Sequence, residues 1–163
     1  MGRSSAYWAA NYYPDAQREP KRTAPYRDLP ASMASRFRLL REGLLERDGV
    51  GETVRFMGDQ WRWAWEYSLG PRKVCWIHLT SLGASGTFTV SEQEERTTLG
   101  LARLSDVVAN AIRAGQRTGP LKWCWIELSD RKATEAFLGF VKRKVGWLEA
   151  QMAATHHRRS AAS

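Results

Sequence analysis

The sequence predicts a single small α+β domain, because helical and strand patterns alternate along most of its 163 residues. Apolar residues recur at three- and four-residue spacing near both ends of this region, which is typical of amphipathic helices. Between them lie alternating or continuously apolar runs, which favour strands joined by short glycine- and proline-containing turns. The expected order is helix, three-strand antiparallel meander, helix, strand, helix, preceded by an extended N-terminal arm.

Three helices are expected from this spacing and from the residues at their ends. The first lies between Pro30 and Gly49 and places four large apolar residues on one stripe. The second begins at Ser105, a suitable N-cap, and ends near Gly115. The third begins after Asp130 and carries its lysine- and arginine-rich segment, residues 142–144, on the solvated side.

Four strands are expected from alternation or from short apolar runs. The first alternates strictly and is separated from the second by Gly70 and Pro71, and glycines at 83 and 86 bracket the turn into the third. The fourth is entered through a Thr-Gly-Pro turn. The expected strands are WRWAWEYS (61–68), VCWIHLTS (74–81), TFTV (87–90) and LKWCWIEL (121–128).

The chain is expected to divide into an arm, a domain and a tail. Residues 1–29 hold many aromatic residues and, with Pro30, four of the six prolines, which predicts an extended arm. Because disordered segments are poor in aromatic residues, we expect this arm to strap onto the domain or onto a partner subunit. Residues 30–150 form the domain, and residues 151–163 are expected to be a basic, flexible tail.

The formal net charge is +8, but the surplus is concentrated near the C-terminus. Residues 31–130 carry thirteen basic and twelve acidic side chains, whereas residues 131–163 carry seven basic and two acidic ones. A folded nucleic-acid-binding domain usually concentrates basic side chains on its binding surface. The distribution disfavours nucleic acid as a partner and leaves one alternative, association through the basic C-terminal end.

Several other classes of protein are disfavoured. No apolar run approaches the ~20 residues of a membrane span, and the N-terminus lacks the apolar stretch of a secretory signal. Cys75 and Cys124 lie in apolar segments without histidine at metal-ligand spacing, which predicts buried thiols, no metal site and no cofactor. We expect a bacterial-type cytoplasmic protein with no membrane partner.

Tryptophan dominates the predicted strands and suggests a binding surface. Successive side chains of a strand point to opposite faces, so the tryptophans of each strand share one face. The economical arrangement puts the Cys, Ile and Leu side chains against helices and gathers the aromatic ones on the other face. The sequence does not fix the register, so the first strand could be flipped. The predicted ligand-binding residues are Trp63, Trp65, Tyr67, Trp76, Trp123 and Trp125.

Three functions are compatible with the sequence. A small-molecule-binding domain is favoured, since indole rings stack on flat ligands or attract cations while a few polar groups orient them. The alternatives for the face itself are a core covered by a helix and a homodimer interface, formed by this face or by the arm. The remaining functions are acid–base catalysis in the same pocket and the nucleic-acid association described above.

The enzyme alternative depends on Glu127 and His78, which the strand pattern places on the aromatic side. A carboxyl group in an apolar cup has its pKa raised, which suits a general acid or base. The structural interpretation is that Glu127 reaches solvent at a strand end and that His78 is a hydrogen-bonded core histidine. The sequence leaves both interpretations open.

The run WEYS…VCWIHLTSLGASGTFTV, followed by LSDVVANAIRAGQRTGPLKWCWIEL, resembles the bacterial family catalogued as domain of unknown function 3788. The resemblance covers about residues 58–145 and rests on a strand-glycine-strand block and on a short helix that leads into a last strand. It implies an α+β fold in a small single-domain cytosolic protein. It includes no catalytic signature, so it assigns no site residue.

Overall fold

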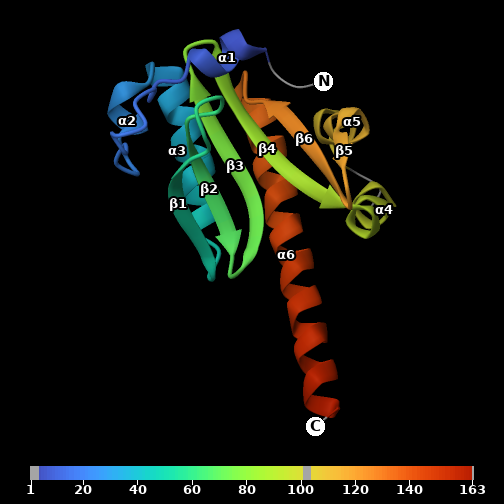
Figure 1. The fold of residues 1–163 in the computed structure, drawn as a ribbon. Helices are drawn as coiled ribbons and strands as arrows, with labels where there is room; N and C mark the ends of the chain where they lie inside the picture. Colours follow the sequence, from blue (N-terminus) through green and yellow to red (C-terminus); the bar gives the residue numbers. More distant parts are fainter. Residues whose placement is uncertain (1–3, 101–103, 163) are drawn as a thin grey trace.

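The computed structural model describes residues 4–100 and 104–162 and has the expected α+β architecture (Figure 1). Its described strands form a six-stranded antiparallel sheet in the order β1-β2-β3-β4-β6-β5. Their bounds are Val50–Phe56 for β1, Trp63–Leu69 for β2, Arg72–Thr80 for β3, Gly83–Ser91 for β4, Gln116–Thr118 for β5 and Leu121–Glu127 for β6.

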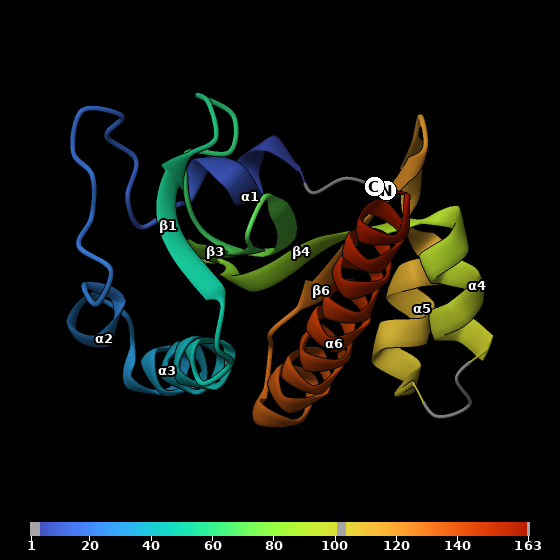
Figure 2. The same cartoon turned by 90° about the horizontal axis from the view of Figure 1, so that it is seen from below.

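Helices cover one face of this sheet (Figures 1 and 2). The helices α3 (Ala31–Leu45) and α6 (Arg131–Ala161) lie side by side against it, and α5 (Asp106–Ala114) packs on β6 next to α6. The shorter α4 (Glu92–Gly100) follows β4. In Figure 2, the arm helix α1 (Ser5–Ala9) and the loop between β1 and β2 lie on the other side of the sheet.

The core lies between the sheet and these helices. Trp65 pairs with Ile77 across β2 and β3, so both side chains point toward the helices, where the Phe37 ring of α3 meets Trp65 at 5.5 Å. Phe88 of β4 contacts Phe137 and Phe140 of α6. Large apolar side chains from strands β2, β3 and β4 and from helices α3 and α6 therefore fill the space between the two layers, which stabilises the fold by removing them from water.

The arm packs against its own domain, which was one of the two predicted arrangements. The arm runs beside the end of β3, where the Tyr12 amide donates to the Leu79 carbonyl at 3.0 Å and the Ser81 amide donates to the Ala10 carbonyl at 2.9 Å. A second short helix, α2 (Pro25–Asp28), packs on α3. Residues 1–3 of the predicted arm lie outside the described residues.

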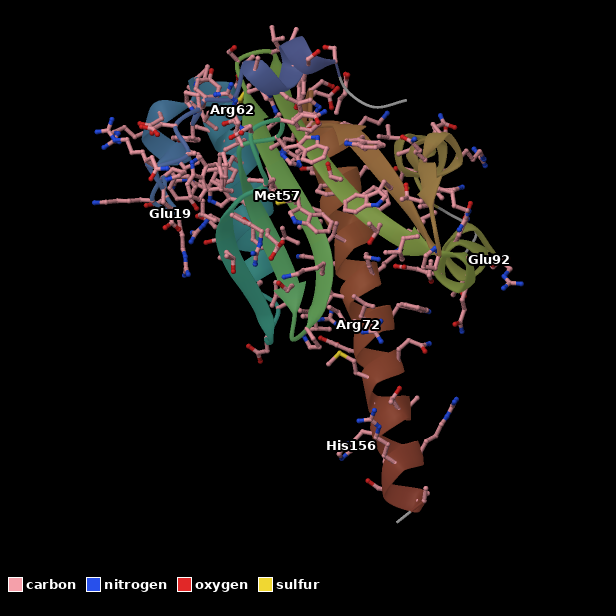
Figure 3. All side chains as sticks on the ribbon, in the orientation of Figure 1. Glu19, Met57, Arg62, Arg72, Glu92 and His156 are labelled. Carbon is pink, nitrogen blue, oxygen red and sulfur yellow. The ribbon has the colours of Figure 1, made fainter. Side chains whose placement is uncertain are left out.

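The structure adds elements that we did not predict and changes three expectations. Strands β1 and β5 and helices α1, α2 and α4 were not predicted, so the arm that was expected to be extended contains two short helices. Helix α6 continues to Ala161 through most of the expected flexible tail, and Figure 3 shows His156 on the part that projects beyond the sheet. Lys144 was expected on the solvated side of the last helix, but it is buried and forms an ion pair with the buried Glu94 of α4.

Among the described helices, none has both the length and the apolar composition needed to cross a bilayer.

Candidate functional site

The sheet face opposite α3 and α6 gathers aromatic and polar side chains from three strands. Residues that are paired across antiparallel strands point to the same face. Thr87 of β4 pairs with Trp76 of β3 on one side and with Trp125 of β6 on the other. His78 lies two residues beyond Trp76 in β3, and Trp123 two residues before Trp125 in β6, so all five residues share this face.

These side chains border a cavity of about 420 Å³. Five of the eight tryptophans of the chain line it, and they come from the arm, the β1–β2 loop and strands β3 and β6. A cavity of this size lies within the ordinary range for small-molecule sites. The lining residues are Trp8, Met57, Trp61, Trp76, His78, Thr87, Gln116, Thr118, Trp123 and Trp125.

The arm and the β1–β2 loop build the outer wall of the cavity. The loop carries Met57 and Trp61 and is closed by two backbone hydrogen bonds, from the Met57 amide to the Arg62 carbonyl and from the Arg62 amide to the Gly58 carbonyl. Gly58 and Arg62 both have positive φ, which permits this tight reversal. The Arg62 guanidinium donates to the Pro14 carbonyl at 3.0 Å and so ties the loop to the arm. Figure 3 labels Met57 and Arg62 in this loop.

The indole rings contact one another and the histidine. The rings of Trp76 and Trp123 lie 5.4 Å apart at an angle of 32°. Trp8, from the arm, meets the His78 ring edge-on at 4.9 Å. Trp61 is the most exposed of the large apolar residues of the loop, at 43%. The cavity therefore has aromatic walls, with Trp61 at its solvent side.

Among the described residues that line this cavity, none is a lysine, arginine, aspartate or glutamate. Burial lowers the pKa of His78 to about 4, so its imidazole is neutral near pH 7. A carboxylate contacts one of the lining residues, since the Trp76 indole N–H donates to Glu66 at 2.8 Å. The site is therefore apolar and uncharged, with a small number of polar groups.

Glu66 lies next to Trp76 on the same face of the sheet and is held by basic side chains. Burial alone would raise the pKa of Glu66, but hydrogen bonds from Lys73, Arg55 and Trp76 outweigh it and lower the pKa. The ionised Glu66 fixes the orientation of the Trp76 ring.

Two polar atoms of the lining residues have no hydrogen-bond partner among the described residues. They are Nδ1 of His78 and Oγ1 of Thr87, and both are shielded from solvent. The two residues, His78 and Thr87, are only 3% and 4% exposed. Most buried polar atoms are paired, so two unpaired ones beside the same cavity indicate a missing partner.

The structure brings together Trp76, Trp123 and Trp125, half of the predicted ligand-binding residues. The predicted position of the other three is wrong. Because Trp65 pairs with Ile77 and Tyr67 with Cys75, strand β2 is flipped relative to the expectation, and Trp63, Trp65 and Tyr67 face the helices.

The polar atoms of these three side chains already have partners. The indole N–H of Trp63 donates to the Asp15 carbonyl, and that of Trp65 donates to the Arg22 carbonyl. The Tyr67 hydroxyl donates to Glu52 at 2.8 Å. These side chains therefore anchor the arm and the core, and they do not border the cavity.

The predicted acid–base pair is not assembled at the cavity. His78 lines it, whereas Glu127 is exposed at the end of β6 and is not among the lining residues.

Cys75 and Cys124 are buried, and burial raises the pKa of both thiols, that of Cys124 to about 12. No cluster of three metal-ligating side chains was found among the described residues.

Six lining residues were not predicted, and one of them, Thr87, lies in the predicted third strand but was not assigned to a site. The aromatic content of the arm was a signal for Trp8, and the alternation of the first strand included Trp61 without assigning it to a site. Met57 precedes that strand in a loop. Gln116 and Thr118 lie in β5, a three-residue exposed strand that has no pattern to detect.

Comparisons of the chain with protein-family models, with curated proteins and with solved structures gave no match. The resemblance to domain of unknown function 3788 therefore stays a prediction. The function must be inferred from the geometry of the cavity.

Proposed function

We propose that this protein binds a small, flat, aromatic molecule in the tryptophan-lined cavity. The observation that carries the proposal is the convergence of five indole rings, from separate parts of the chain, on one cavity of about 420 Å³. A fold that needed only a core at this place could fill it with Leu, Ile and Val, which have no N–H group to satisfy. Here the rings border a space instead of filling it.

The chemistry of the lining favours an uncharged or cationic ring system over an anion. Indole faces are electron-rich and stack on flat rings or attract cations. An anion that enters loses its hydration, and no lysine or arginine of the lining replaces it. His78 offers no positive charge either, because burial lowers its pKa to about 4.

The proposal can be tested by nuclear magnetic resonance with the full-length protein. Each tryptophan gives one indole N–H signal, so all eight can be followed during titration with a library of flat heteroaromatic metabolites. We expect at least one compound to shift the signals of the five cavity tryptophans, because ring currents act over short distances. Trp63, Trp65 and Trp147 are internal controls, since none of them lines the cavity.

A matched pair of variants adds an affinity measurement. Trp125→Ala removes one wall of the cavity and should weaken binding of a hit roughly fivefold, in keeping with about 1 kcal/mol for an aromatic contact. Trp147→Ala removes a half-buried tryptophan of α6 and should leave the affinity unchanged. No shift with any compound, or equal shifts at the three control tryptophans, would overturn the proposal.

A further inference from the structure

The inner surface of the cavity carries two polar side chains surrounded by aromatic ones. We call His78 and Thr87 the polar floor. Thr87 lies between its cross-strand neighbours Trp76 and Trp125, and His78 lies diagonally across the β3–β4 pair from it. The polar floor is therefore central to the sheet face and is not part of the cavity rim.

The neighbours of the polar floor have their hydrogen bonds satisfied, whereas the floor does not. Ser85 pairs with His78 across the strands and accepts a hydrogen bond from the Tyr7 hydroxyl at 2.7 Å. The Trp76 indole N–H is bound to Glu66. In contrast, Nδ1 of His78 and Oγ1 of Thr87 have no partner in the part of the chain that the structure describes.

Two unpaired polar atoms at one place are costly to the folded protein. Both atoms are shielded from water, so solvent does not compensate for the missing hydrogen bonds. The Trp8 ring covers His78 edge-on, and it belongs to a five-residue helix of the arm. A ligand group that reaches the polar floor, with a small shift of this ring, would supply the missing partners.

The chemistry of the two residues defines what they would recognise. A neutral imidazole has one donor nitrogen and one acceptor nitrogen, and a threonine hydroxyl both donates and accepts. Neither carries a charge, so a neutral polar group matches them without an unpaired charge. A site that is built to hydrogen-bond a ligand discriminates strongly against analogues that lack the polar group.

We propose that the polar floor, His78 and Thr87, selects ligands in which the edge of a flat ring system both donates and accepts hydrogen bonds, as a cyclic amide does. This inference rests on the proposed function, because it assigns the specificity of the same cavity. The aromatic walls bind the faces of the ring, and the polar floor binds its edge.

The test compares two probes of similar shape on the full-length protein. Quinolin-2-one has a cyclic amide edge, whereas naphthalene has the same two fused rings without polar atoms. We expect the protein to bind quinolin-2-one at least tenfold more tightly than naphthalene by isothermal titration calorimetry. The nitrogen signals of the His78 imidazole should shift with quinolin-2-one more than with naphthalene, which reports on the hydrogen bond directly.

Variants at Thr87 separate hydrogen bonding from shape. Thr87→Val keeps the branched side chain and removes the hydroxyl, so quinolin-2-one should bind about tenfold more weakly while naphthalene changes by less than twofold. Thr87→Ser keeps the hydroxyl and should retain most of the preference. Thermal melting checks that each variant is folded, and Thr87→Ala replaces the valine variant if that one is not.

The outcomes distinguish this inference from the proposed function. Equal affinity for the two probes, or an equal loss of both in Thr87→Val, would overturn the role of the polar floor and leave an aromatic-binding cavity in place. No binding of either probe, together with unchanged indole signals, would overturn the role of the floor and count against the cavity as a ligand site as well.

Discussion

His78 illustrates how one buried side chain links the cavity to the stability of the fold. The imidazole is 3% exposed, lies on the central strand β3 and is covered by Trp8 of the arm. Removal from water disfavours its charged form, and this lowers the pKa to about 4 from an ordinary value of 6.5. Between about pH 4 and pH 6.5, His78 is therefore neutral in the folded protein and protonated in the unfolded chain.

This difference predicts a loss of stability in mild acid. The unfolded chain binds the proton below about pH 6.5 and the folded protein only below about pH 4. His78 therefore does not reduce the unfolding free energy above pH 6.5, and it reduces this free energy progressively as the pH falls from 6.5 to 4. The shift corresponds to about 3 kcal/mol of unfolding free energy. Urea denaturation at pH 7.5 and pH 4 should show a smaller loss in His78→Gln than in the original protein. Equal losses in both proteins would contradict the prediction.

At the scale of elements, the contact between α6 and β4 depends on the absence of one side chain. Gly86 faces Phe137 of α6, and a Cβ atom at Gly86 would lie 2.5 Å from Cζ of the Phe137 ring. The ring is fully buried and also meets Phe88, so it has little room to move. Gly86 therefore lets the helix approach the sheet closely.

We expect Gly86→Ala to lower the unfolding free energy by about 1–3 kcal/mol, the usual cost of overpacking a core. Gly51→Ala is the matched control, because Gly51 is also in a strand and nothing lies within 4 Å of the added methyl group. Chemical denaturation measures both. The double variant Gly86→Ala/Phe137→Leu should lose less unfolding free energy than the sum of the two single losses. A loss equal to that sum would contradict the proposed clash.

The elements that the sequence predicted are those with strong local patterns. Helices α3, α5 and α6 and strands β2, β3, β4 and β6 have periodic or continuous apolar residues, and the predicted class is confirmed. In strand β1 (VGETVRF) Glu52 interrupts the apolar alternation, helix α4 (EQEERTTLG) is largely polar, and β5 has three residues, so none of them has a strong pattern. Their conformation depends on tertiary contacts.

The site was predicted only in part, because the register of β2 is a long-range property. Both faces of this strand are buried, from Trp63 to Tyr67, so alternation does not distinguish the helix side from the cavity side. A glutamate would normally mark the solvent side, but Glu66 is buried by its bonds to Arg55, Lys73 and Trp76. In strands β3 and β6, Cys, Ile and Leu side chains alternate with the tryptophans and mark the helix side, so these tryptophans were placed correctly.

At the scale of the whole molecule, the two ends of the chain have opposite relations to the domain. The N-terminal arm buries Tyr7, Trp8 and Asn11 on the sheet and lines the cavity with one of them. The Asn11 side chain also donates to the Trp61 and Trp63 carbonyls and so braces the β1–β2 loop. In contrast, the last turns of α6 project from the domain with exposed side chains.

Matched deletions at the two ends test this asymmetry. Removing residues 2–13 takes away the buried Tyr7 and Trp8, each of which contributes about 1.5–3 kcal/mol by burial, together with the backbone bonds to β3. At roughly 2–4 °C per kcal/mol for a chain of this size, the melting temperature should fall by about 6 °C or more. Removing residues 152–163, an equal number, should change it by less than about 2 °C, because the described side chains among them are exposed. Calorimetry on both proteins gives the comparison, and similar shifts for the two deletions would show that the arm adds no more to the fold than the projecting helix does.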